Sequence, residues 1–100
     1  MRDLFHPTAD QLNLSTILNA LGDPVRLRIL KTLADGQEAT CACFCALGMT
    51  KSALSHHFKV LRESGLINIR IEGKKHFLSI RYEDINGRFP GLLASVLSAV

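Results

Sequence analysis

The sequence contains no long apolar run. None of its stretches approaches the roughly 18 uncharged apolar residues that a membrane-spanning helix needs. Near the amino terminus, Asp3, Pro7 and Asp10 interrupt the region where a signal peptide would carry a continuous apolar segment. We therefore expect a cytoplasmic chain that has no membrane partner.

Cysteine is scarce, and its number is odd. All three cysteines lie in the hexapeptide TCACFC, as Cys41, Cys43 and Cys45. A chain that stays in a reducing compartment is not expected to use a structural disulfide framework, and the odd count points the same way. Three interpretations of the trio remain open: packing in a core, reversible oxidation, or binding of a soft metal or metalloid ion.

Arrangements typical of enzymes are also missing. The sequence shows no paired carboxylates, no glycine-rich loop for phosphate, and no set of nucleophile, base and orienting group. Cysteine and histidine occur, but these residue types are too generic to indicate catalysis. We predict that the protein is not an enzyme. The chain has no internal repeat, linker or low-complexity segment, so residues 1–100 are expected to form one domain.

The sequence does carry a localised positive charge. Of its 12 basic residues, seven lie between Thr50 and Tyr82, whereas only two of its nine acidic residues lie there. The rest of the chain is therefore weakly acidic, although the whole has a net charge of +3. This distribution predicts a surface that binds a polyanion such as a nucleic acid.

The spacing of apolar residues predicts a mainly α-helical α+β chain. The expected segments are a helix over 8–21, a helix over 24–35, a short helix within 37–48, a helix over 51–64, a hairpin over 67–82 and a helix over 90–100. Three helices followed by a two-stranded ribbon form a winged helix-turn-helix arrangement. Residues 40–64 would be the helix-turn-helix, residues 67–82 the wing, and the first and last helices a dimerisation surface.

The helix over 51–64 is predicted to read DNA. On a helical wheel, Leu54, Phe58 and Leu61 form a buried stripe, and a polar arc that is poor in acids lies opposite. The first half of such a helix faces base edges, whereas later cations hold the phosphate backbone. His57 lies nearer the core and is interpreted as structural. With the cations of the wing, the candidate DNA-binding residues are Thr50, Lys51, Ser52, Ser55, His56, Lys59, Arg62, Arg70, Lys74 and Lys75.

Two stretches resemble the ArsR/SmtB family of bacterial winged-helix repressors. They are ALGDPVRLRILKTLADG and TKSALSHHFKVLRESGLINIRIEGKKHFLSIR, within a match that runs from about residue 14 to residue 82. The resemblance implies a homodimer that binds a palindromic double-stranded DNA operator and leaves it when an inducer arrives. It also places the DNA-reading helix at residues 50–64 and the wing at residues 67–82.

The two ends of the chain independently suggest a dimer. Each carries an apolar stripe that a small helical core cannot easily bury, and exposure would leave a large apolar patch. The alternative is that these helices simply complete the core of the monomer. The stripe residues are Leu14, Ile17, Leu18, Leu21, Leu92, Leu93, Val96, Leu97 and Val100.

The resemblance bears on the cysteines as well. Metal-sensing members of the family carry a Glu-x-Cys-x-Cys motif, which is present here only in broken register, since neither alignment supplies both thiols. The family's second metal site needs histidine on the last helix and is not expected, because that region offers only Glu83 and Asp84. If Cys41, Cys43 and Cys45 converge, they suit a trigonal soft ion.

The inducer therefore stays open at this point. The candidate ligands are arsenite, antimonite, cadmium or zinc, with His6 of a partner's arm as a fourth ligand for zinc, and an oxidant is the alternative. The rival functions are a winged-helix regulator without thiol sensing and a protein-interaction module without specific DNA binding.

Overall fold

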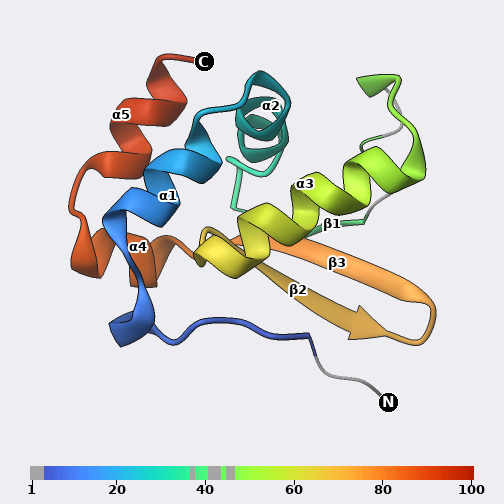
Figure 1. Ribbon diagram of the computed structural model, residues 1–100, viewed down its shortest axis with the longest axis horizontal. Helices are drawn as coiled ribbons and strands as arrows, with labels where there is room; N and C mark the ends of the chain where they lie inside the picture. Colours follow the sequence, from blue (N-terminus) through green and yellow to red (C-terminus); the bar gives the residue numbers. More distant parts are fainter. Residues whose placement is uncertain (1–3, 37, 41–43, 45–46) are drawn as a thin grey trace.

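Helices lie on one side and at one end of a small antiparallel sheet in this chain (Figure 1). The computed structural model describes residues 4–36, 38–40, 44 and 47–100. Its elements are η1 (Ala9–Gln11), α1 (Leu14–Leu21), α2 (Pro24–Thr32), β1 (Ala39–Thr40), α3 (Lys51–Ser64), β2 (Ile67–Glu72), β3 (Lys75–Ile80), α4 (Tyr82–Arg88) and α5 (Leu92–Ser98). The expected α+β class is confirmed, and the strands are ordered β1-β3-β2. None of the helices in the described part is long and apolar enough to cross a membrane.

The first expected helix is divided into two. Thr8 and Gln11 form a capping box, but it caps only the short 3-10 turn η1. The chain is extended at Leu12, whose side chain is buried, and Asn13 then caps α1 by accepting a hydrogen bond from the Thr16 backbone at 3.2 Å. The prediction of one helix over 8–21 was wrong because a second cap competes inside it.

A second difference from the expected elements lies before α3. Ala39 and Thr40 were placed in a short helix, but they form strand β1 and pair with Leu78 and Phe77 of β3. Strand pairing gives the outer side of β3 hydrogen-bond partners that a helix would leave unsatisfied. Between Thr32 and Lys51, the described residues include no α-helix. The three cysteines, Cys41, Cys43 and Cys45, lie outside the described residues.

The boundaries of α3 are those expected from the sequence. The hydroxyl of Thr50 accepts a hydrogen bond from the Ala53 backbone at 3.2 Å and caps the amino end. Gly65 closes the helix with a left-handed conformation, φ +90°. Because only glycine adopts this conformation without steric cost, the chain turns sharply here from α3 into the wing.

The predicted hairpin forms β2 and β3, with Ile67 opposite Ile80 and Glu72 opposite Lys75. Its carboxyl end differs from the prediction, because Tyr82 opens a helix, α4, that was not expected. Asn86 and Gly87, a pair common in turns, both lie inside α4. Glu83 and Asp84 in the first turn favour the helix through its dipole.

The apolar stripes at the two chain ends are shared between core and surface. Ile17, Leu21, Leu93 and Leu97 are buried in the monomer, so the expectation that they lie in a dimer interface is corrected in favour of the alternative. One side of the α1 stripe packs on α2 and α3, and one side of the α5 stripe packs on α2 and α4. Helical periodicity alone does not show which apolar residues such neighbours cover. The other members stay accessible: Leu14 at 45%, Leu18 at 49% and Val100 at 44% exposed, with Leu92 and Val96 half-buried.

Candidate nucleic-acid interface

Helix α3 presents the two faces that its sequence predicts. Leu54, Phe58 and Leu61 are buried against the core. The exposed face carries hydroxyl, imidazole and ammonium groups and no acid before Glu63; its members are Thr50, Lys51, Ser52, Ser55, His56 and Lys59. His57 is half-buried beside this face, and its Nδ1 atom has no hydrogen-bond partner among the described residues. The structural interpretation of His57 agrees with that position.

Arg62 departs from the predicted polar arc. It is only 8% exposed, and its guanidinium donates a hydrogen bond to the backbone carbonyl of Phe5. The helical wheel could not show that residues 4–8, which we call the N-terminal arm, cover this end of α3. The expectation that Arg62 lies free to hold a DNA phosphate is therefore corrected, because its charge is enclosed by the protein's own chain.

The N-terminal arm also contacts the wing through His6. The Nε2 atom of His6 accepts a hydrogen bond from the backbone N–H of Ile69 at 3.0 Å, and Nδ1 donates to the Leu4 carbonyl at 3.1 Å. Burial lowers the pKa of His6 below its ordinary value of 6.5; the Leu4 hydrogen bond opposes this effect, and the charges of Arg62 and Arg81 reinforce it. With both ring nitrogens engaged, His6 does not have a free ligand atom for zinc in this arrangement.

Arg70 on β2 is held by two acids. Its guanidinium pairs with Glu38 at 2.8 Å and with Glu72, and it lies 4.5 Å from the centre of the Phe77 ring. The hydrogen bond from Arg70 lowers the pKa of Glu38. Arg70 is 45% exposed, so it can still approach a phosphate, but its positive charge is largely balanced.

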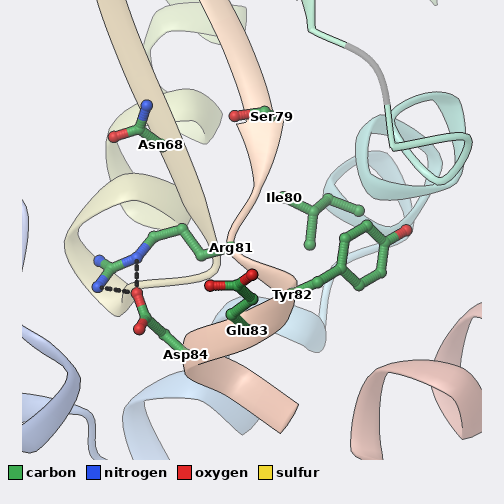
Figure 2. Close-up of a pocket in the computed structure, with 7 residues that line it drawn as sticks. All are labelled: Asn68, Ser79, Ile80, Arg81, Tyr82, Glu83 and Asp84. Carbon is green, nitrogen blue, oxygen red and sulfur yellow. Dashed lines mark hydrogen bonds and ion pairs between the residues drawn. The ribbon is translucent and has the colours of Figure 1, made fainter. Parts of the chain in front are cut away.

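A second arginine is paired at the base of the wing. Arg81 donates to Asp84 at 2.9 Å, and the pair forms part of an open pocket of about 310 Å³ (Figure 2). Asn68 and Ser79 from the hairpin and Glu83 from α4 complete its polar wall. Arg62, Arg70 and Arg81 are therefore engaged within the protein, whereas the lysines of this region, Lys51, Lys59, Lys74 and Lys75, are exposed.

One exposed residue near α3 was missed in the sequence. His76 on β3 alternates with Leu78 and Ile80 and so lies on the side of the hairpin that faces α3. The period of two in HFLSI indicates that His76 shares one side of the strand with Leu78 and Ile80. Alternation alone, however, does not show which side of a hairpin a helix will cover, so the imidazole was not predicted as a contact.

A helix with an acid-poor exposed face, packed on a β-hairpin with lysines at its tip, defines a winged helix-turn-helix domain. A sequence model of one protein family, described as bacterial regulatory protein, arsR family, matches residues 23–68 of this chain. The chain belongs to this ArsR family, whose members and fold are those of transcriptional regulators and not of enzymes.

Individual relatives agree with this assignment. The chain is 39% identical over 70 residues to an arsenical resistance operon repressor of Staphylococcus xylosus, a match that covers 70% of this chain and 67% of that protein. It is 33% identical to the HTH-type transcriptional regulator YceK of Bacillus subtilis, and the match covers 87% of this chain and 88% of that protein. It is 31% identical to a transcriptional repressor SmtB homolog of Synechocystis, and the match covers 67% of this chain and 51% of that protein.

Solved structures extend the likeness to the fold. HlyU from Vibrio cholerae superposes with a TM-score of 0.71 at 26% identity and covers 86% of this chain and 89% of its own. The homodimeric winged helix-turn-helix DNA-binding domain of a possible ArsR-family regulator from Mycobacterium bovis gives a TM-score of 0.68 at 29% identity, with 85% and 78% covered.

Proposed function

We propose that the protein is a homodimeric repressor that binds a palindromic operator in double-stranded DNA. The exposed, acid-poor face of α3 beside the lysines of the wing carries this proposal. Lys51, Ser52, Ser55 and His56 would meet base edges in the major groove. Thr50 at the cap of α3, Lys59 on α3, and Lys74 and Lys75 at the wing tip would hold the DNA backbone. Arg70 would have a lesser role because its charge is balanced.

The proposed dimer uses the accessible part of the terminal helices. Leu14 and Leu18 on α1 and Val100 beyond α5 are exposed apolar residues, and α1 and α5 lie at the end of the molecule opposite the wing tip (Figure 1). Joining two copies there would leave both α3 helices free to enter successive major grooves about 34 Å apart. The relative from Mycobacterium bovis is described as homodimeric, which supports this arrangement.

Release from DNA would follow from an agent that acts on Cys41, Cys43 and Cys45. Phe44, which lies among them in sequence, is buried. Its ring packs edge-to-face on the ring of Phe58 on α3, with 5.3 Å between the ring centroids. A bond formed to the neighbouring thiols would therefore act on the core side of the reading helix. The relatives include an arsenical resistance operon repressor, and one HlyU structure is described as reduced, so a metalloid or soft metal ion and an oxidant both remain candidates.

Fluorescence anisotropy with labelled duplexes tests the proposal. The wild-type protein should bind an operator selected from a random pool more tightly than random DNA. Its affinity should fall steeply with salt, because each phosphate contact releases a counterion. Absent or salt-insensitive binding would favour a protein-interaction module instead.

A further inference from the structure

A groove separates the reading helix from the wing. It has a volume of about 210 Å³, with Ser55 and Lys59 on the α3 side and His76 on the β3 side. Leu4 of the N-terminal arm, Phe58 and Ile69 give it an apolar floor, and the enclosed Arg62 also borders it. No acidic side chain lines the groove among the described residues.

The chemistry of the rim suits an anionic oxygen. Lys59 supplies an ammonium, Ser55 a hydroxyl donor and His76 an imidazole that donates through a ring N–H whether it is neutral or protonated. All three residues are exposed, so these groups are accessible to a ligand. Arg62 adds positive charge from below, although its hydrogen-bonding capacity is partly used by the Phe5 carbonyl.

The position of the groove indicates which anion it would bind. Adjacent major and minor grooves of a duplex are separated by one sugar-phosphate strand. If α3 enters the major groove and the wing approaches the neighbouring minor groove, that strand must pass between them. On the protein surface, the gap that this DNA strand would cross is the groove between Lys59 and His76.

We propose that this groove seats a DNA backbone phosphate, which Lys59 and His76 contact together. The inference rests on the proposed DNA-binding function and adds His76 as a contact residue. It also assigns Lys59 a defined partner, which is one phosphate in each half-site at the boundary between the major and minor grooves of the DNA. The N-terminal arm takes part indirectly, because Leu4 forms one side of the seat and Arg62 holds the arm in place.

A cycle of protein and DNA substitutions tests this seat. The DNA is an operator selected in vitro by the wild-type protein, in which one phosphate per half-site is replaced by an uncharged methylphosphonate, position by position. For the wild-type protein, a methylphosphonate at one position, on the boundary between the major and minor grooves of the DNA, should lower the affinity at least threefold. The double variant Lys59→Ala/His76→Ala should bind the unmodified operator more weakly and should not respond to neutralisation at that position. Its response to neutralisation elsewhere should remain.

Two controls separate the outcomes. Arg28→Ala removes the same charge from α2, outside the groove, and should retain the wild-type response at every position. His76→Lys, which keeps a donor at the rim, should keep the response that His76→Ala weakens. The salt slope of Lys59→Ala should be smaller than that of the wild type by roughly 0.9, the value for one phosphate neutralised by one cation.

The proposal fails if the double variant responds to each methylphosphonate as the wild type does, while the wild type still selects an operator. A wild type that selects no operator overturns the proposed function and the groove together. Circular dichroism of each variant excludes unfolding as the cause of an altered response.

Discussion

His6 and Ile69 are joined by a hydrogen bond of 3.0 Å, from the backbone N–H of the wing strand to the imidazole Nε2 atom. Arg62 of α3 binds the same arm at the neighbouring Phe5 carbonyl. The N-terminal arm therefore connects the reading helix to the wing, in addition to the covalent turn at Gly65. Both connections set how the reading helix and the wing are placed relative to each other.

The His6 bond predicts a pH dependence of folding stability. The pKa of His6 is lower in the folded protein than its ordinary value of 6.5, so its contribution is present above pH 6.5 and is lost as the pH falls through the folded pKa. Protonation removes the acceptor for Ile69, which is worth about 1 kcal/mol. Urea denaturation at about pH 7.5 and about pH 5.5 should show a larger decrease in unfolding free energy for wild type than for His6→Gln.

The other histidines, His56, His57 and His76, are present in both proteins, so the difference isolates His6. Equal decreases in the two proteins would mean that His6 is not the responsible group.

Gly65→Ala should destabilise the fold by about 3 kcal/mol. The residue has φ +90°, and an added Cβ would lie 2.1 Å from Cδ2 of the buried Leu12. Gly36→Ala is the matched control, because its φ is +83° but no atom lies within 4 Å of the added Cβ. It should cost only about 1 kcal/mol. Thermal or urea denaturation measures both values, and similar values would contradict close packing of Leu12 on the turn.

Leu18→Lys should weaken dimerisation while the monomer stays folded. Leu18 is 49% exposed in the monomer, whereas Ile17 beside it is fully buried. Removal of two buried leucines per dimer, each worth about 1.5 kcal/mol, would raise the dissociation constant roughly a hundredfold. Sedimentation velocity over a concentration series measures this change. Ile17→Lys should instead unfold the chain, and an unaltered oligomeric state of Leu18→Lys would exclude α1 from the interface.

His56→Ala and Ser52→Ala should relax sequence preference, whereas Lys74→Ala should weaken binding to all duplexes about equally. Base-edge contacts distinguish sequences, and phosphate contacts do not. The ratio of affinities for the selected operator and for single-base variants should fall by about tenfold at the contacted base in the first two proteins. A change of specificity without a decrease in general affinity in Lys74→Ala would reverse the proposed roles of helix and wing.

Replacement of Cys41, Cys43 and Cys45 by serine should abolish the response to the inducer. Operator binding of wild type and of the triple variant is measured with arsenite, antimonite, cadmium, zinc and hydrogen peroxide. The effective agent should release the wild type and leave the variant bound, because serine offers neither a soft ligand nor an oxidisable thiol. If none of these agents changes wild-type binding, sensing through this trio has no support.

Much of the reading helix could be predicted because its determinants are local. Thr50 and Gly65 mark its ends, and the spacing of Leu54, Phe58 and Leu61 identifies its buried side. The hairpin followed equally well from alternation and a glycine turn. The break at Asn13, strand β1 and helix α4 were missed, since each depends on competing caps or on pairing with residues distant in sequence.

The order of the main elements, the acid-poor face of α3 and the resemblance to a repressor family could be recognised from the amino-acid sequence, because periodicity, caps and charge are local properties of the chain. Which charged side chains are available to a ligand depends on the folded structure. Arg62 and Arg70 are engaged by Phe5 and Glu38, which lie far from them in sequence. Arg81 pairs with Asp84 only three residues further along. The folded structure likewise divides the apolar stripes between core and surface. Burial and pairing are properties of neighbours in space, and those neighbours exist only once the chain has folded.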